Sequence, residues 1–390
     1  MDEKRISRKE LTKQNLKKNK KRKNIKTLII IAITAVMVYI TGIYGASLAY
    51  FGDFISSGLA LVQIGKGFPI EEDFSSVLQG EKMGTGLCIL TPDYLNVYSP
   101  TGKKIFTYSH AMQNPIISAS KNRAIIYDLN GTTLKVANGH NILFQQEMPN
   151  NIIHADISNS NRVAVTTRSS SYNGEVAVFN YNMKQRFVWY CATGYPIYSC
   201  LSDSGDRLAI NTVQTEGGML KCDIYVIDAS KGKELFSISC SDYPVKIEFL
   251  NDDKILIAYA NKLVIYSVSK NSEILSYEFG DAGIQALHTA GSYITVAYGG
   301  ASSGQSSKIA MLSQDFTEKF VVEVPEKIKS LSVSQSRIFA LGYNNLYEYD
   351  YSANLVNTIS TGPLYKQLVD YNGTLIVSST AIQKVEKTKK

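Results

Sequence analysis

The sequence predicts an all-β protein, a β-propeller of eight four-stranded blades preceded by one transmembrane α-helix. Three observations support this prediction. Residues 27–52 contain no charged side chain and directly follow a strongly basic segment. From Phe74 onward, short runs of Val, Ile, Leu, Tyr and Phe alternate with clusters of Gly, Asn, Asp and Ser, which is typical of many short strands. These runs recur with a period of about forty residues.

Residues 1–26 are expected to form a basic cytoplasmic tail. They carry twelve Lys and Arg side chains against three Asp and Glu, and positively charged flanks of membrane helices stay in the cytoplasm. The apolar run that follows exceeds the ~20 residues that a bilayer-crossing helix needs, so we expect a transmembrane helix at residues 27–50. A cleaved signal peptide is the main alternative, but its apolar region is usually only ~7–15 residues long.

The remaining chain is expected on the extracytoplasmic side and is nearly neutral. Residues 27–390 carry 29 basic and 31 acidic side chains, so the sequence offers no electrostatic footprint for nucleic acid. Within the expected helix, Gly42 and Gly45 each precede an alanine by four residues, a spacing that would allow a helix-mediated dimer. Residues 51–67 are expected to form a juxtamembrane linker.

The repeat units each read as four strands. A four-stranded sheet with two apolar faces cannot bury both faces alone, whereas stacking such sheets into a closed ring buries them. The spacing between units, from 36 to 48 residues, fits propeller blades. The first strands of the units are expected to begin near Ser75, Ile116, Ile152, Ile197, Val245, Ile284, Ile328 and Tyr365.

Eight starts predict eight blades within residues 68–386, followed by a basic tail at 387–390. The last unit has only three recognisable strands, so its fourth strand is expected to come from the extended stretch at Gly67–Ile70. A chain that pairs its end with its beginning would close the ring. Seven blades is the alternative, because the first and last units are the least regular.

Two local patterns accompany the repeats. The turn before the second strand often ends in a basic residue, as at Arg123, Arg162, Arg207, Lys254 and Arg337. The five cysteines are too few for a disulfide scaffold. Cys222 and Cys240 flank a hairpin and are expected roughly opposite each other, although the sequence does not decide whether they are bonded.

No motif for catalysis, cofactor binding or metal binding occurs in the sequence. The four histidines lie in different units without metal-ligand spacing, and CxxC, GxSxG, HExxH and Walker A patterns are absent. Eight-bladed quinone-dependent dehydrogenases repeat a tryptophan after a Gly-Lys turn, whereas this chain has only Trp189. We therefore expect no catalytic residue, cofactor or metal. Two or more close carboxylates or histidines at the channel mouth would favour the alternative, an enzyme working there.

Several segments resemble one family of proteins. They are GKGFPI at Gly65–Ile70, YLNVYSPTGKKIFTYSHAMQNPIISASKNRAIIYDLNG at Tyr94–Gly131, YNGEVAVFNYNMKQRFVWY at Tyr172–Tyr190 and LSDSGDRLAI at Leu201–Ile210. Together with the basic tail and apolar run, they resemble membrane-anchored bacterial propellers of uncharacterised function, found mainly in Gram-positive Firmicutes and related to quinoprotein-like and WD40-like propellers. The resemblance implies an architecture and a location at the cell membrane. It implies no active site.

One face of the ring is the candidate binding face. The long insertions at Arg168–Gly174, Val213–Leu220 and Gly299–Ser307 all join second to third strands, and such loops share a face with the connections between blades. Insertions concentrated on one face often mark a binding face, although surface loops are also simply free to lengthen. The expected face residues are Tyr172, Tyr195, Tyr243, His110, Glu216 and Gln305.

These observations favour a membrane-anchored, non-catalytic binding or scaffold domain at the cell envelope. Its expected partners are the lipid bilayer, through the transmembrane helix, and an envelope protein or glycan, through the loop face. The alternatives are an envelope enzyme that uses the propeller channel and a sensor of an extracellular ligand. The sequence does not reveal the identity of the partner or the process served.

Overall fold

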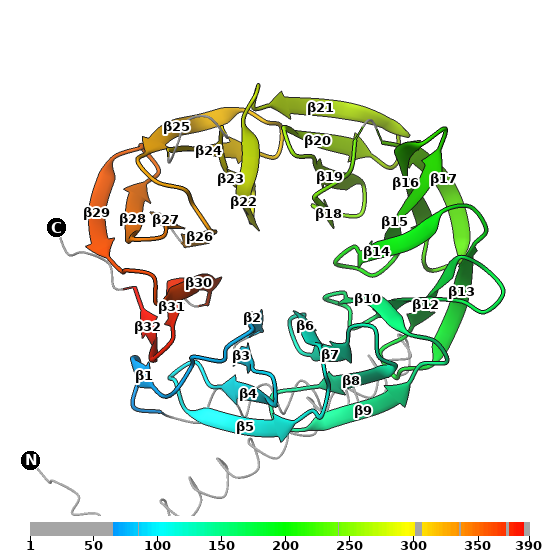
Figure 1. Ribbon diagram of the computed structural model, residues 1–390, viewed down its shortest axis with the longest axis horizontal. Coiled ribbons are helices and arrows are strands. Elements are labelled where there is room, and N and C mark those ends of the chain that lie inside the picture. The colour runs from blue at the N-terminus through cyan, green and yellow to red at the C-terminus, as the bar shows by residue number, and fades with distance from the viewer. Residues whose placement is uncertain are drawn as a thin grey trace, which may run out of the picture. The chain divides into compact units, whose positions relative to one another are not determined.

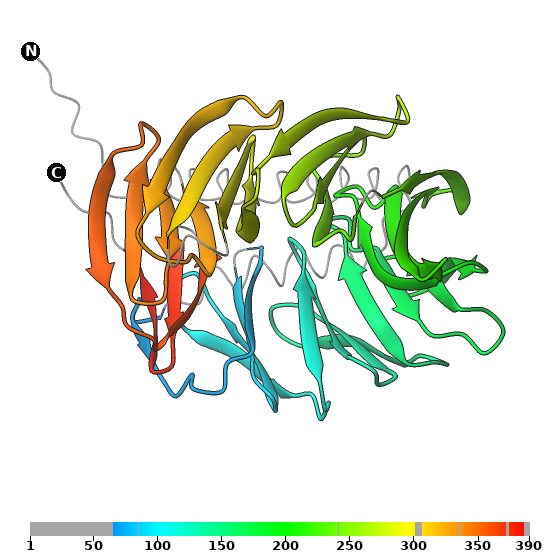
Figure 2. The same ribbon diagram turned by 45° about the horizontal axis from the view of Figure 1, so that its top comes forward.

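Eight four-stranded antiparallel sheets form a closed ring around a central channel (Figure 1). The computed structural model describes residues 65–84, 86–240, 242–300, 306–334, 337–371 and 374–385. Figure 2 shows the twisted sheets standing side by side around the ring. The expectation of eight blades is confirmed and the seven-bladed alternative is wrong.

Each blade runs from an innermost strand beside the channel to an outermost strand at the rim. The strands of the first four blades are β2 (Gln79–Met83), β3 (Gly86–Leu90), β4 (Tyr94–Tyr98), β5 (Lys104–Ser109), β6 (Pro115–Ala119), β7 (Ala124–Asp128), β8 (Thr133–Ala137), β9 (Ile142–Glu147), β10 (Ile152–Ile157), β11 (Val163–Thr167), β12 (Gly174–Phe179), β13 (Gln185–Cys191), β14 (Tyr195–Leu201), β15 (Arg207–Glu216), β16 (Met219–Asp228) and β17 (Lys233–Ser239). The strands of the last four blades are β18 (Lys246–Phe249), β19 (Lys254–Ala258), β20 (Lys262–Ser267), β21 (Ser272–Glu278), β22 (Gly283–Ala290), β23 (Tyr293–Gly299), β24 (Ser307–Ser313), β25 (Glu318–Val324), β26 (Ser330–Ser334), β27 (Arg337–Leu341), β28 (Asn345–Asp350), β29 (Leu355–Ser360), β30 (Tyr365–Asp370), β31 (Thr374–Ser378), β32 (Ala381–Lys384) and β1 (Ile70–Glu71).

The eighth blade combines the two ends of the described chain. Its order is β30, β31, β32 and β1, so the N-terminal strand forms its rim. Ile70 pairs with Ile382 and Glu71 pairs with Ala381. The N-terminal side of the chain therefore supplies the fourth strand of the last blade, as expected. This strand begins at Ile70, which is the last residue of the expected stretch Gly67–Ile70.

The hydrophobic core is divided among the junctions between blades. Eight clusters of buried apolar side chains occur, and each joins two neighbouring blades. The second strands, such as β3 and β11, are buried along their whole length because blades cover both of their faces. Outermost strands such as β5 and β9 alternate between half-buried and exposed positions. This division explains why one blade could not fold without its neighbours.

Most expected strand starts lie within two residues of the observed ones. The exception is the first blade, in which β2 begins at Gln79 rather than near Ser75. Ser75 belongs to the segment between β1 and β2, where its backbone N–H donates to the carboxylate of Asp73. This segment buries Phe74 and Val77 as a strand would, but it crosses from the eighth blade to the first.

The expected cytoplasmic tail, the transmembrane helix at residues 27–50 and most of the linker at 51–67 lie outside the described residues. So does the C-terminal tail at 387–390. Within the described part of the chain, no helix is long and apolar enough to cross a membrane.

Cys222 and Cys240 lie opposite each other, as expected, on β16 and just after β17. The backbone N–H of Cys240 donates to the carbonyl of Cys222 at 2.9 Å. All five cysteines are free thiols in this structure, and four of them are buried.

Candidate functional site

The antiparallel order of the strands gives the ring two different faces. One face carries the loops between second and third strands and the connections between blades, and we call it the insertion face. The other carries the short turns between first and second and between third and fourth strands, and we call it the turn face. The placement of the three insertions on one face follows directly from the strand pairing.

Exposed large apolar side chains are unevenly distributed between these faces. Among the described residues, none lies in a turn of the turn face, and those outside the insertion face lie on the outermost strands β13, β17, β25 and β29. The insertion-face set is Leu78, Tyr94, Tyr172, Tyr195, Met219, Leu220, Tyr243, Val245, Tyr343 and Leu364. An exposed apolar grouping of this kind is a common mark of an interaction surface.

Six of these ten residues gather on the third, fourth and fifth blades and the connections between them. The ring of Tyr172, on the loop between β11 and β12, lies 4.8 Å from the ring of Tyr190 on β13. The same loop continues into Gly174, where an added Cβ would lie 2.5 Å from Cγ of Pro196. This close approach brings the loop of the third blade against the start of β14, which carries Tyr195, and fixes two tyrosine-bearing segments side by side.

The insertion in the fourth blade is a projecting hairpin. We expected a loop at Val213–Leu220, but β15 and β16 stay paired out to Glu216 and Met219. Gly217 and Gly218 form the two-residue turn with φ of +59° and +80°, as a tight hairpin turn requires. The alternating side chains and the Gly-Gly pair explain why the ladder continues.

The tip of this hairpin extends beyond both neighbouring strands. On one side, the pairing of β14 with β15 ends at Tyr195 and Val213. On the other, the last pair between β16 and β17 is Asp223 with Ser239. Met219 is 74% exposed and Leu220 is 63% exposed. We refer to residues 214–221 as the hairpin tip, and it presents two apolar side chains to solvent.

The expected face residues occupy different environments. Tyr172, Tyr195 and Tyr243 are exposed on the insertion face. Glu216 is exposed in the hairpin tip and lies 3.0 Å from Nζ of Lys221. Gln305 lies outside the described residues, as do residues 301–304 of the same insertion.

The expectation that His110 is presented on this face is wrong. His110 is 1% exposed. Its Nε2 lies 2.9 Å from the carbonyl of Thr91, and its Nδ1 accepts a hydrogen bond from the backbone N–H of Met112. A sharp connection between two blades leaves backbone N–H and C=O groups without strand partners. The buried imidazole of His110 supplies hydrogen-bond partners for two of them.

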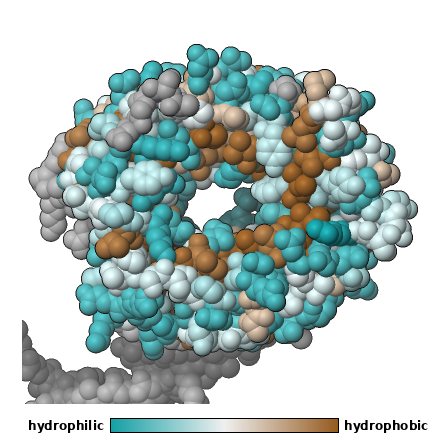
Figure 3. Space-filling model, viewed as in Figure 1, coloured by the Kyte–Doolittle hydropathy of each residue, from teal (hydrophilic) through white to brown (hydrophobic). Residues whose placement is uncertain are grey.

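Apart from the insertion face, the channel contains a concave site that the sequence did not indicate. Figure 3 shows the channel open through the middle of the ring. A hollow of about 240 Å³ lies where β10, β14 and β18 reach the turn face. We call it the channel hollow. The side chains that define its chemistry are Asp156, Tyr198, Cys200, Asp203, Lys246 and Glu248.

Asp156 and Glu248 are held in different ways. The carboxylate of Asp156 accepts hydrogen bonds from Oγ of Ser118 at 3.1 Å and from the backbone N–H of Leu201 at 2.8 Å. Burial raises the pKa of Asp156, and these hydrogen bonds oppose the rise. Oε2 of Glu248 lies 2.5 Å from Nζ of Lys246. Oε1 of Glu248 is buried and has no hydrogen-bond partner in the described structure.

The thiol of Cys200 and the phenol of Tyr198 are neutral hydrogen-bonding groups at ordinary pH. Burial raises the pKa of Cys200 well above its ordinary value, and the nearby carboxylates of Asp156 and Glu248 add to the rise. Burial also raises the pKa of Tyr198. A thiol and a phenol that stay protonated are poor nucleophiles, so they can bind but are not activated.

Hydrogen bonds between neighbouring innermost strands surround most of the channel. Polar side chains link neighbouring innermost strands, or the residues beside them, at six of the eight junctions, through the pairs Gln79–Ile117, Ser118–Asp156, Asp156–Leu201, Gln285–Ile328, Ser330–Leu368 and Gln367–Gly80. At the other two junctions, polar contacts between blades lie farther from the innermost strands, through the pairs Ser204–Asp252 and Tyr277–Glu318. No such hydrogen bond joins β14 to β18 or β18 to β22 in the described chain. The channel hollow lies at the first of these two junctions.

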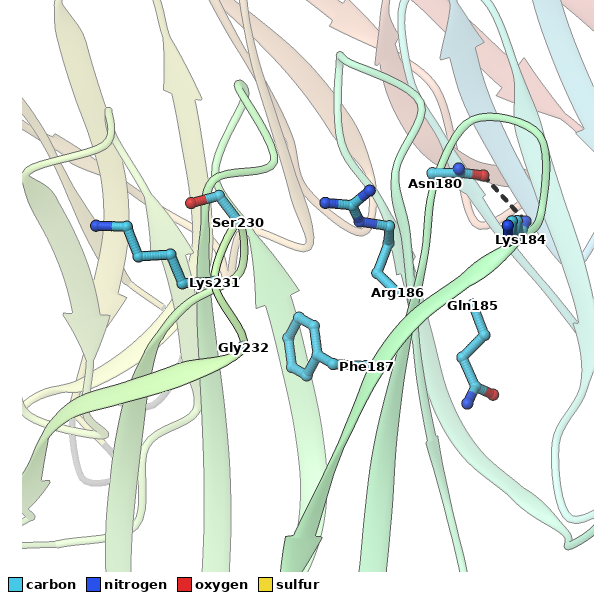
Figure 4. Close-up of a pocket in the computed structure, with 8 residues that line it drawn as sticks. All are labelled: Asn180, Lys184, Gln185, Arg186, Phe187, Ser230, Lys231 and Gly232. Carbon is cyan, nitrogen blue, oxygen red and sulfur yellow. Dashed lines mark hydrogen bonds between the residues drawn. The ribbon is translucent and has the colours of Figure 1, made fainter.

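The turn face has a shallow cleft of about 320 Å³ between the third and fourth blades (Figure 4). Lys184, Arg186 and Lys231 line it together with the ring of Phe187. Nζ of Lys231 lies 3.7 Å from the carboxylate of Asp228. All three cations are exposed to water, which screens them strongly, so the cleft is a solvated basic surface.

The sequence matches one family model over residues 63–386, the model described as "Family of unknown function (DUF5711)". The chain belongs to this family. The match spans every strand of the ring, from β1 to β32. No curated protein matches the chain in sequence.

Two solved structures are similar to this DUF5711 protein in fold. One is BamB from Moraxella catarrhalis, with a TM-score of 0.55 and 12% identity over 84% of this chain and 99% of that chain. The other is Sqt1 from Saccharomyces cerevisiae, with a TM-score of 0.61 and 9% identity over 83% of this chain and 100% of that chain. At these identities the similarity establishes the propeller fold alone.

The described residues of the DUF5711 chain contain no group of three His, Cys, Asp or Glu side chains that could hold a metal ion. The residues that sequence reasoning missed lie in the channel hollow. Their signal is the alternation of polar side chains on the innermost strands, as in His154 and Asp156 or Lys246 and Glu248. Strands that faced only apolar neighbours would not keep such side chains.

Proposed function

We propose that this protein is a binding or scaffold domain that captures a protein or glycan partner on its insertion face without chemistry. The observation that carries the proposal is the one-sided distribution of exposed apolar side chains. Tyr172, Tyr195, Tyr243 and the hairpin tip lie on three consecutive blades, whereas the turns of the opposite face present polar groups. Tyrosines with a few apolar neighbours are enriched at the centres of binding surfaces.

The rigid attachment of these side chains favours binding. Tyr172 is held by the ring of Tyr190, and Tyr195 begins a strand that is paired along its length. A surface ordered in advance loses less conformational entropy when a partner docks. The hairpin tip adds an apolar projection at the edge of the tyrosine surface.

The location proposed for this surface is the cell envelope. The basic tail and the apolar run at residues 27–50 support a single membrane helix with the propeller outside the cytoplasm. The insertion face would then meet envelope proteins or glycans, and a helix-mediated dimer would present two such faces. The near-neutral charge of residues 27–390 gives no support to a nucleic-acid partner.

The alternative of an enzyme at the channel rests on Asp156 and Glu248, which line one hollow. Binding is favoured over catalysis there because the described residues of the hollow include no activated nucleophile. The carboxylate of Asp156 already accepts hydrogen bonds, and Glu248 is paired with Lys246.

Crosslinking in intact cells, followed by pull-down of the tagged full chain, tests the proposal. The test variant combines Tyr172→Ala, Tyr195→Ala and Tyr243→Ala with deletion of Thr215, Glu216, Met219 and Leu220. This deletion keeps Gly217 and Gly218 as a turn between Gln214 and Lys221, which are already partners across the hairpin. The two flanking strands therefore keep their register and facing.

The matched control replaces Leu355 and Ile359 by alanine. Both are exposed apolar residues, but they lie on the outermost strand β29, away from the insertion face. The test variant should lose the partners that the wild type captures, and the control should keep them. Capture of the same partners by the test variant would place the binding surface elsewhere.

A further inference from the structure

The described chain enters the ring at the turn face. Residues 65–67 lie against the turn between β4 and β5, which belongs to this face. The backbone N–H of Gly65 donates to Oγ1 of Thr101 at 2.7 Å, and the N–H of Gly67 donates to the carbonyl of Thr101 at 2.9 Å. β1 then runs away from this face, because it pairs antiparallel with β32, which ends there.

This entry point relates the two faces of the ring to the membrane. Only residues 51–64 separate the apolar run at residues 27–50 from Gly65. If that run is the membrane helix proposed above, the shortest path from it leads to the turn face. The inference below rests on that proposed location and goes beyond it, because it assigns a ligand to the face opposite the insertion face.

The outer turns of the turn face carry mostly positive charge. These turns join third to fourth strands and comprise residues 99–103, 138–141, 180–184, 229–232, 268–271, 314–317 and 351–354. Their Lys, Arg, Asp and Glu side chains, all exposed, are Lys103, Lys184, Lys231, Lys270 and Asp315. The described loops of the insertion face hold no comparable excess of basic side chains.

The acidic residues of the turn face lie mainly in its inner turns, which join first to second strands beside the channel (Figure 1). Asp206 there is paired with Arg162 at 2.5 Å, and Asp252 accepts a hydrogen bond from Oγ of Ser204 at 2.6 Å. In the outer turns, the carboxylate of Asp315 already accepts from Ser313 and Thr317. The free positive charge therefore lies toward the outside of this face.

The turn-face cleft gathers three of the cations around one aromatic ring. Lys184 and Arg186 come from the third blade and Lys231 from the fourth, with the ring of Phe187 between the two turns (Figure 4). The turns are fixed side by side, because an added Cβ at Gly232 would lie 3.0 Å from Cγ of Phe187.

The charges of this cleft are available to a ligand. Among the described residues, Lys184 and Arg186 have no carboxylate partner, and Lys231 lies 3.7 Å from the carboxylate of Asp228. A guanidinium matches two oxygens of a phosphate group, and ammonium groups add point charges. A single exposed ion pair is weak in water, but several cations act together on a surface that carries many negative charges.

We propose that the turn face docks on the membrane surface and that its cleft binds the phosphate groups of anionic phospholipids. Lys184, Arg186 and Lys231 contact the headgroups, and Lys103 and Lys270 on other outer turns add attraction. The insertion face then points away from the membrane and stays open to its partner. Binding is electrostatic and involves no covalent step.

Lysine labelling of the full chain in lipid nanodiscs tests this proposal. The nanodiscs contain phosphatidylcholine alone or with about one-third phosphatidylglycerol, and a water-soluble acylating reagent modifies exposed lysines, which mass spectrometry then quantifies. Labelling of Lys184 and Lys231 should fall about threefold or more in the anionic nanodiscs, and high salt should restore it. Lys308 and Lys327, exposed on the insertion-face side, should react equally in both.

A charge-reversal variant connects the protection to the cleft. Lys184→Glu, Arg186→Glu and Lys231→Glu together should remove the lipid-dependent protection of Lys103 and Lys270. The matched control, Arg168→Glu with Lys308→Glu and Lys327→Glu, makes the same change of charge on the insertion-face side and should keep the protection of the cleft. All six substituted residues are exposed. Should the reversal variant fail to fold, the corresponding three glutamine substitutions should weaken the protection, and unchanged protection would overturn the proposal.

The remaining outcomes separate this inference from the proposed function. Equal labelling of Lys184 and Lys231 in both nanodiscs, with partner capture on the insertion face retained, would overturn the docking alone. Equal protection by soluble glycerol phosphate in phosphatidylcholine nanodiscs would mean that the cleft binds free phosphate, which would also overturn it. A chain that does not insert into phosphatidylcholine at all would overturn the proposed location and the docking together.

Discussion

Ile70 and Ile382 are direct partners in two antiparallel strands, and this pair joins the first strand of the described chain to the last. Both side chains are buried in the same cluster, together with Phe74, Leu87 and Val377. The contact is more than a local strand pair, because it turns eight blades in a row into a ring. Every other strand pair of the described chain joins strands that follow each other in sequence, so this pair carries the longest loop closure in the fold.

The first prediction concerns this closure. Ile70→Asp should lower the free energy of unfolding by about 3 kcal/mol or more, because it places a charge without a partner in an apolar cluster. Glu71→Gln is the matched control, since Glu71 is the exposed neighbour in the same strand and should change little. Urea unfolding of the full chain, followed by intrinsic fluorescence, measures both. Equal midpoints for the two variants would mean that the ring does not need this strand.

The ring itself could be predicted from the sequence because its signal is repeated. Eight units with similar spacing define the blades even when single strands are ambiguous, and the missing strand of the last unit predicts the exchange with the N-terminal side. The start of β2 was misplaced for a physical reason. Phe74 and Val77 in the preceding segment are buried between two blades, and an apolar run alone does not reveal whether a segment pairs as a strand.

The candidate site could be predicted only in part. Tyr172, Tyr195 and Tyr243 are exposed because insertions and connections between blades must lie on the surface. His110 lies in a connection of the same kind but turns inward, where two backbone groups need its nitrogens. The channel hollow depends on contacts among β10, β14 and β18, which lie far apart in the sequence, and no local pattern reports which side chains meet there.

The second prediction concerns the core between the third and fourth blades. Ile210 on β15 is fully buried in a cluster with Ala164, Leu208 and Ile227. Ile210→Asp should destabilise the protein severely, by several kcal/mol, which is on the order of the whole stability of a domain. Thr215→Asp is the control, because Thr215 lies on the same strand but is exposed in the hairpin tip. Thermal unfolding measures both, and an unchanged melting temperature for Ile210→Asp would contradict the burial of this face.

The third prediction concerns the dependence of stability on pH. Burial lowers the pKa of His154 to about 4, well below its ordinary value. Between pH 4 and about 6.5, the unfolded chain therefore binds a proton at this position that the folded chain does not. Stability rises with pH wherever the unfolded state binds more protons. The neutral imidazole of His154 therefore makes its full contribution to the free energy of unfolding above about pH 6.5. This contribution is lost as the pH falls toward 4.

His154→Asn isolates this effect. The raised pKa values of Asp156 and Glu81 also influence the pH dependence, but both groups are present in the wild type and the variant. Between pH 6.5 and pH 4, the wild type should lose about 3 kcal/mol more stability than the variant. Urea unfolding at a series of pH values measures the difference. Parallel curves for the two proteins would mean that the pKa of His154 is the same in the folded and the unfolded chain.

The last prediction concerns the basic residues that end the turns before second strands. The sequence shows their regular position, and the structure shows that Arg123 and Arg162 reach a neighbouring blade. The guanidinium of Arg123 in the second blade donates to the carbonyl of Tyr181 in the third and lies 5.7 Å from the ring centre of Phe144. Arg162 in the third blade donates to the carbonyl of Gly205 at 2.7 Å and contacts Asp206 at 2.5 Å, both in the fourth.

The more deeply an arginine is buried, the more its replacement should lower the free energy of unfolding. Arg123 is 1% exposed, so Arg123→Met should cost about 3 kcal/mol through the loss of a charge-assisted hydrogen bond and a cation–π contact. The side chain of Arg162 is 31% exposed, so Arg162→Met should cost only about 1 kcal/mol because water screens its ion pair. Arg186→Met is the control, since Arg186 is exposed in the turn-face cleft and should have almost no effect. Urea unfolding of the three variants checks the order, and a larger loss for Arg162→Met than for Arg123→Met would show that burial does not set the strength of these contacts between blades.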